Sequence, residues 1–163
     1  MKKVYLAEAE RTGVPWKKRM YDSQNFSSGD PINRTLTAAN AALYGVAHAV
    51  IASLGFIPSL GVIHQGTERA FVYDIADLYK AEVSIPAAFD AVAENELTAD
   101  VNIRRVIRDY VVKKNLIPTM TQDLMFLMEM SSEAQNIDAE LVLWSDLEVV
   151  ASKRNWSDDG PIR

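Results

Sequence analysis

The sequence contains no cysteine among its 163 residues, which excludes a disulfide scaffold, cysteine-ligated zinc or iron–sulfur sites, and a thiol nucleophile. It also lacks a Gly-rich phosphate loop and a nucleophile-elbow serine. The net charge of −5 excludes a basic field over the whole chain. With 48% hydrophobic and 24% charged residues, the composition is that of a globular protein with a sizeable core.

The charges are unevenly distributed along the chain. Residues 1–34 hold seven Lys or Arg against four acids, whereas residues 116–163 hold three against nine. This asymmetry predicts two surfaces with different partners. Residues 35–67 carry no charge, but polar side chains interrupt them in an amphipathic pattern, which predicts a buried helix and a loop rather than a membrane span. No apolar run follows Lys2 and Lys3, so we expect no signal peptide.

Hydrophobic periodicity predicts a mainly α fold. Asp30 and Pro31 are start signals for a long core helix that runs up to Gly55, and Thr67 is the expected cap of a later helix. Pro118 is expected to break or kink the fifth helix. The predicted helices span residues 2–12, 31–54, 68–80, 84–95, 98–115 and 119–131, and residues 139–151 predict a β-hairpin or an edge strand. We therefore expect a helical domain over residues 1–131 and a tail over residues 132–163.

One set of residues stands out as a candidate for catalytic chemistry: His64, Asp74 and Asp77. The two aspartates are three residues apart on one predicted helix, and His64 lies on the loop that leads into it. An imidazole and two carboxylates suit Mg²⁺ or Mn²⁺, although such an aspartate pair is also common on solvated helix faces. The other histidine, His48, falls within the long core helix and is expected to be an interior residue.

The predicted loop over residues 14–30 is long enough to suggest a functional role. Its aromatic residues are Trp16, Tyr21 and Phe26, and basic residues stand between them. Two interpretations remain open: the aromatics stack on nucleic acid, or they pin the loop to the core.

A second basic group lies on the fifth predicted helix. Arg104, Arg105 and Arg108 are spaced so that they can contact successive phosphates. Alternatively, two of them form i,i+4 ion pairs with Asp100 and Asp109 on a solvated surface.

Several segments of the chain resemble the CRISPR-associated spacer integrase, the catalytic subunit of CRISPR adaptation, and most closely its type I-E branch. The likeness spans about residues 2–112. It is carried by the segments Val14-Pro15-Trp16-Lys17-Lys18-Arg19-Met20-Tyr21-Asp22, Gly29-Asp30-Pro31-Ile32-Asn33, Ala42-Leu43-Tyr44-Gly45-Val46, Gly61-Val62-Ile63-His64-Gln65-Gly66 and Phe71-Val72-Tyr73-Asp74-Ile75-Ala76-Asp77.

This resemblance implies the helical C-terminal domain of a metal-dependent DNA endonuclease and integrase, which joins the 3′-hydroxyl of captured DNA to the CRISPR repeat by transesterification. It implies Mg²⁺ or Mn²⁺ held by His64 and Asp77, with Asp74 as a further acidic site residue. It also implies a set of DNA-contacting residues: Arg19, Tyr21, Phe26, Tyr44, Lys80, Arg104 and Arg108.

Two departures from the family pattern shape the expectation. The family's metal-binding Glu aligns just upstream of Met1, and Glu8 and Glu10 lie turns away on the same predicted helix. The family's N-terminal β-domain, which forms its homodimer, also has no counterpart in the sequence. We therefore expect a C-terminal fragment with weak metal binding and impaired activity.

Two other interpretations remain open. The chain is either a non-catalytic DNA-binding or scaffold fragment of the adaptation complex, or, less in keeping with the motifs, an unrelated helical hydrolase of small phosphate esters. The resemblance implies branched or double-stranded DNA and the smaller adaptation subunit as partners, no membrane, and a cytoplasmic location. The acidic tail and residues 139–151 are the expected docking elements for that subunit.

Overall fold

We describe a computed structural model of the chain, which defines residues 1–20, 30–128, 142–144 and 149–151. The chain divides into a unit of residues Met1–Glu129 and a second unit of residues Met130–Arg163. The first contains six helices among its described residues: α1 (Lys2–Thr12), α2 (Pro31–Ser53), α3 (Ala70–Tyr79), α4 (Ser84–Glu94), α5 (Ala99–Lys113) and α6 (Leu116–Leu127). The mainly α fold predicted from periodicity is confirmed.

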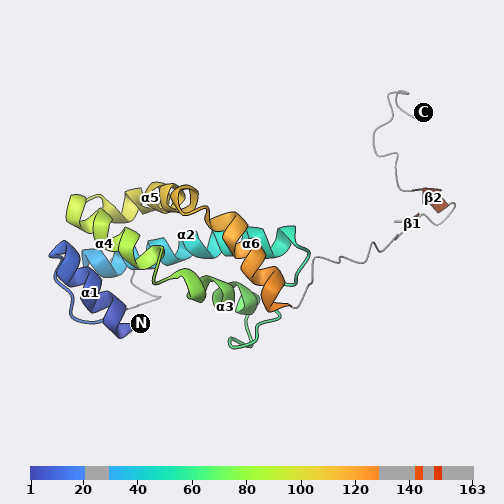
Figure 1. Cartoon of the computed structure of the whole chain (residues 1–163), viewed down its shortest axis with the longest axis horizontal. Helices are drawn as coiled ribbons and strands as arrows, with labels where there is room; N and C mark the ends of the chain where they lie inside the picture. Colours follow the sequence, from blue (N-terminus) through green and yellow to red (C-terminus); the bar gives the residue numbers. More distant parts are fainter. Residues whose placement is uncertain (21–29, 129–141, 145–148, 152–163) are drawn as a thin grey trace, which may run out of the picture. The chain divides into compact units, whose positions relative to one another are not determined.

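Helix α2 is the centre of the helical unit and runs along its middle in Figure 1. It begins as predicted, because the Asp30 carboxylate accepts a hydrogen bond from the Asn33 amide at 2.8 Å and Pro31 fits the first turn. It packs against α3, α4, α5 and α6. The largest fully buried apolar side chains come from five helices and the turn before α4: Phe89, Leu36, Leu43, Ile51, Ile85, Ile103, Ile107, Met120, Leu124, Val72 and Val83.

The length and composition of α2 alone would allow it to cross a membrane. Its apolar residues, however, pack into the core of the helical unit, as Leu36, Leu43 and Ile51 show by being fully buried. A buried core helix is therefore the better explanation of the uncharged stretch. His48 departs from the prediction: it is exposed, because it lies off the stripe formed by Leu43, Ala47 and Ile51.

Helix α1 has no fully buried residue and is held by contacts with α4 and with the segment that follows it. It ends at Gly13, whose φ of 72° is the left-handed conformation that glycine adopts easily. Tyr5 stacks on Trp16 with ring centroids 4.8 Å apart, and Trp16 meets Phe89 of α4 edge-on at 5.8 Å. For Trp16 the structure favours the interpretation that the aromatic pins its loop to the core.

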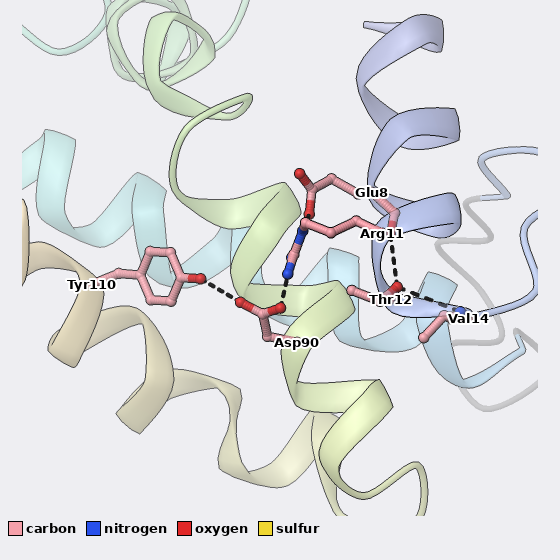
Figure 2. Close-up of polar contacts among 6 residues, drawn as sticks. All are labelled: Glu8, Arg11, Thr12, Val14, Asp90 and Tyr110. Atoms are coloured by element: carbon pink, nitrogen blue, oxygen red, sulfur yellow. Dashed lines mark hydrogen bonds and ion pairs between the residues drawn. The ribbon is translucent and has the colours of Figure 1, made fainter.

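A polar network joins α1 to α4 and α5, as Figure 2 shows. Arg11 of α1 donates to Glu8 one turn earlier and to Asp90 of α4 at 2.6 Å. The Tyr110 hydroxyl of α5 donates to the other carboxylate oxygen of Asp90 at 2.5 Å. Asp90 therefore connects three helices.

Three predicted helices have wrong boundaries, and the largest error is in α6, which spans Leu116–Leu127 rather than residues 119–131. Helix α3 begins at Ala70 rather than directly after Thr67, because the Phe71 amide donates to the Pro58 carbonyl at 2.9 Å and so finds its acceptor outside the helix. Helix α5 ends at Lys113, and Asn115 turns the chain with φ 50°. Pro118 lies in the first turn of α6, where its missing N–H is tolerated, so it does not break α5.

In the second unit, β1 (Val142–Trp144) and β2 (Val149–Ala151) pair antiparallel, with Leu143 opposite Val150. The hairpin is the first of the two alternatives expected for residues 139–151.

Candidate functional site

A pocket of about 620 Å³ brings together five of the residues singled out from the sequence. They come from distant parts of the chain: Arg19 precedes α2, Tyr44 belongs to α2, His64 lies between α2 and α3, and Asp77 and Lys80 lie at the end of α3. The other lining residues are Tyr5, Thr37, Asn40, Ala41 and Tyr73. The pocket thus combines cations, a carboxylate, an imidazole and aromatic rings.

His64 is oriented by the buried carboxylate of Asp74. The His64 Nδ1 lies 2.6 Å from Asp74 Oδ1, and the His64 backbone amide donates to the same oxygen at 3.0 Å. The other oxygen, Oδ2, accepts from the amides of Val62 at 2.5 Å and Ile63 at 2.9 Å. One carboxylate therefore shapes the segment before His64 and also fixes its ring.

The environment keeps Asp74 ionised. Burial alone would raise its pKa, but the backbone amides of Ile63, His64 and Val62 and the His64 ring together lower the pKa of Asp74 to about 2. Its side chain is only 6% exposed, against 43% for the His64 side chain. Asp74 therefore holds the His64 ring at Nδ1, and in a neutral ring with its proton on Nδ1 the other nitrogen, Nε2, carries a lone pair.

Asp77 is paired with a lysine in the same pocket. Its carboxylate lies 2.5 Å from Lys80 Nζ, and this ammonium also lies 5.0 Å from the centre of the Tyr44 ring. Burial would lower the pKa of Lys80, but the bonds with Asp77 and Tyr44 raise it above the ordinary value. Lys80 is therefore a cation, and a metal ion or a phosphate entering the pocket must compete with this ion pair.

Arg19 reaches the pocket from the segment before α2. Its guanidinium donates to Thr37 Oγ1 at 2.7 Å and to Asn33 Oδ1 at 3.0 Å. Burial raises the pKa of Tyr5, while the charges of Arg19 and Lys80 act in the opposite direction. The two cations therefore face the same space from different elements.

The side chains that line the pocket offer two ligands for a divalent metal ion. The described residues contain no group of three His, Asp or Glu side chains that could hold a metal. With Asp74 engaged in four hydrogen bonds, the pocket offers His64 Nε2 and the Asp77 carboxylate. Mg²⁺ accepts one or two carboxylates together with several waters, so this set fits a weakly held hard cation.

The remaining predicted residues are not gathered in the pocket. Arg104 and Arg108 are exposed on α5. Arg108 pairs with the adjacent Asp109 at 2.8 Å, whereas Asp100 pairs with Arg34 of α2 at 3.1 Å. Asp100 and Asp109 therefore pair with arginines other than their expected i,i+4 partners. Arg104 and Arg108 remain exposed on the surface. Tyr21 and Phe26 lie outside the residues that the structure describes.

Tyr73 lines the pocket and was not proposed from the sequence as a site residue. Its ring meets Tyr44 edge-on at 4.9 Å and His64 at 5.7 Å. A signal was available: Tyr73, Asp77 and Lys80 are spaced i, i+4, i+7, so they share one face of α3. Asn40 and Thr37 also line the pocket, but nothing in the sequence pattern distinguished them from the other polar residues of α2.

Searches with protein-family models found no match. Curated proteins, in contrast, match clearly. CRISPR-associated endonuclease Cas1 2 of Thermus thermophilus is 47% identical over 127 residues, covering 78% of this chain and 39% of the relative. CRISPR-associated endonuclease Cas1 of Clostridium sp. is 39% identical over 150 residues, covering 91% of this chain and 50% of the relative. The Escherichia coli protein of the same name is 35% identical over 142 residues, or 85% of this chain and 46% of the relative.

Solved structures give the same result. The crystal structure of a TtCas1–DNA complex matches with a TM-score of 0.75 and 48% identity over 77% of this chain and 48% of that chain. The crystal structure of TtCas1 matches with a TM-score of 0.70 and 45% identity. The chain spans about half the length, or less, of the relatives and structures that it matches. By sequence and fold the chain matches the C-terminal helical region of the CRISPR-associated endonuclease Cas1 proteins.

Proposed function

We propose that the chain is the helical catalytic part of a metal-dependent DNA endonuclease and integrase of CRISPR adaptation, an antiviral defence. The observation that carries this proposal is the pocket in which His64, Asp77, Arg19 and Lys80 converge from separate elements. The match to a Cas1 structure solved with DNA supports DNA as the ligand. The chemistry of the pocket agrees, because cations bind phosphate and tyrosine rings stack on bases.

The proposed reaction is transesterification at a DNA phosphate. The 3′-oxygen of the captured DNA forms a bond to a phosphorus atom of the CRISPR repeat, the bond from that phosphorus to its original 3′-oxygen breaks, and the proton passes from the attacking to the leaving hydroxyl through solvent. Arg19 and Lys80 bind and orient the phosphate. Mg²⁺ or Mn²⁺, when bound, supplies charge neutralisation and a lowered pKa for a bound hydroxyl.

Within this proposal, His64 Nε2 and Asp77 hold the ion, and Asp74 orients the His64 ring. Two ligands predict weak binding, and strand transfer by this chain alone is expected to be slow. Tyr44, whose ring lies beside the Lys80 ammonium, contacts the DNA near the phosphate. Arg104 and Arg108, exposed on α5, contact phosphates farther along the DNA. Tyr21 and Phe26 lie near the path of the DNA.

The second candidate function is a DNA-binding or scaffold fragment without catalysis. The Asp77–Lys80 ion pair favours it, because a carboxylate already paired at 2.5 Å is a poorer metal ligand. For both functions we propose a cytoplasmic protein that does not bind membranes and contacts the smaller adaptation subunit through the β1–β2 hairpin. Deletion of residues 139–151 is expected to abolish that contact, and unchanged binding of the subunit would contradict it.

A nicking and strand-transfer assay distinguishes the two functions. The chain is incubated with end-labelled branched DNA in Mn²⁺ or EDTA, beside the variants His64→Ala and His48→Ala. The enzyme proposal predicts slow products in Mn²⁺ that disappear in His64→Ala and persist in His48→Ala, because His48 is exposed and lies outside the pocket. Salt-sensitive DNA binding without any Mn²⁺-dependent product would instead support the scaffold function.

A further inference from the structure

The buried side chain of Asn33 holds the segment from which Arg19 enters the pocket. Asn33 lies in the first turn of α2 and is 2% exposed. Its Oδ1 accepts from the Met20 amide at 2.8 Å and from Arg19 Nη1 at 3.0 Å, and its Nδ2 donates to the Lys18 carbonyl at 3.1 Å. One amide side chain thus binds the backbone on both sides of Arg19.

These contacts matter because residues 18–20 belong to no helix or strand. In regular structure, neighbouring backbone groups would satisfy the Lys18 carbonyl and the Met20 amide, whereas here the Asn33 side chain takes that role. Only an amide carries both a donor and an acceptor in this geometry. Carboxylates lack the donor, and hydroxyls are too short to span both groups.

The same arrangement points the Arg19 guanidinium along α2. Nη1 also contacts the Asn33 carbonyl at 3.3 Å, and Nη2 donates to Thr37 one turn further on. Thr37 and Arg19 both line the pocket that contains His64 and Asp77. Asn33, together with Thr37 and the Met20 carbonyl, which also accepts from Nη1, therefore directs the arginine before any ligand enters.

We propose that Asn33 is a positioning residue that preorganises Arg19 to bind a DNA phosphate in the pocket; this rests on the proposed function in so far as the ligand is DNA. Asn33 itself is buried and does not touch the DNA. Its contribution to binding passes through Arg19, because without the anchor the guanidinium is no longer held where it contacts the phosphate.

A double-mutant cycle tests this dependence. Binding of fluorescently labelled branched DNA is titrated over a range of KCl concentrations for the chain, Asn33→Ala, Arg19→Gln and the double variant. Each single variant is expected to weaken binding severalfold and to reduce the salt slope by about 1, the value for one lost phosphate contact. The double variant is expected to bind no more weakly than Arg19→Gln alone.

Thr35→Val is the matched control for a buried polar group in the same turn. Thr35 is fully buried and donates to the Pro31 carbonyl at 2.8 Å, and among the described residues it makes no hydrogen bond to residues 18–20. It is expected to lower thermal stability without changing the salt slope. Trypsin cleavage after Arg19, followed by mass spectrometry, is expected to be faster in Asn33→Ala than in Thr35→Val.

Three results would overturn the proposal. The first is an unchanged salt slope in Asn33→Ala. The second is that Asn33→Ala lowers the affinity for DNA equally in the parent chain and in Arg19→Gln. The third is DNA binding that Arg19→Gln leaves unchanged. Failure of the enzyme proposal would be a different result. If no Mn²⁺-dependent product forms while DNA binding still depends on Arg19 and Asn33 as a coupled pair, catalysis is refuted and this inference is supported.

Discussion

Replacing Asp74 with asparagine tests how the pocket is built, because the two side chains have the same shape. The carboxylate accepts from three backbone amides, those of Val62, Ile63 and His64, and contacts the His64 ring. An amide has one acceptor oxygen. If that oxygen takes the position of Oδ2, two backbone bonds survive and the NH₂ group faces the His64 amide, which loses its acceptor.

The size of the destabilisation follows from the hydrogen bonds that Asp74→Asn removes. One buried donor without a partner and the loss of the negative charge from the remaining bonds together predict a decrease of about 2–4 kcal/mol in the free energy of unfolding. The NH₂ group also faces the His64 Nδ1, which must then accept a hydrogen bond. We therefore expect the proton of the neutral His64 ring to move to Nε2, where it blocks the nitrogen proposed to bind metal.

Urea unfolding at pH 7 measures the first effect, and ¹⁵N NMR of the histidine ring measures the tautomer. Asp109→Asn is the control, since Asp109 is exposed and pairs with the neighbouring Arg108. The control is expected to change stability by less than about 0.5 kcal/mol. A loss of that small size in Asp74→Asn, with the proton still on Nδ1, would refute the role assigned to Asp74.

Two further predictions concern the frame around the pocket. Gly61→Ala is expected to destabilise the chain and displace the connection before α3, because a Cβ at this position would lie 2.6 Å from the Ala70 Cβ; a melting temperature equal to that of the parent chain would contradict this. Burial, followed by the bond to Asp90, raises the pKa of Tyr110 to about 12, so its contribution to stability is present below pH 10 and is lost as the pH rises through 12. Asp90→Asn is expected to lower the pKa of Tyr110 in an ultraviolet titration, and an unchanged titration curve would show that the Asp90 carboxylate does not raise it.

The sequence predicted those parts of the fold that depend on local signals. Asp30 and Pro31 start α2 through contacts within four residues, and the stripe of Leu36, Leu43 and Ile51 has the period of a helix that is buried on one side. Thr67 failed as a cap because the Phe71 amide bonds a carbonyl thirteen residues earlier, and such a contact leaves no periodic pattern.

The site could be predicted only in part, because the contacts that shape it join residues distant in the sequence. The resemblance singled out His64, Asp74 and Asp77, but spacing on a helix could not show which aspartate is buried. Asp74 turns toward the backbone of residues 62–64, while Asp77 stays 41% exposed beside Lys80.

Binding of Mn²⁺ tests the central claim most directly, namely that His64 and Asp77 form a cation site. Calorimetric titration of the chain, His64→Ala and His48→Ala compares the two histidines of the sequence in the same protein. The account predicts weak binding in the parent chain, the same affinity in His48→Ala and none in His64→Ala. Equal binding in all three proteins, or no binding in the parent chain, would contradict it.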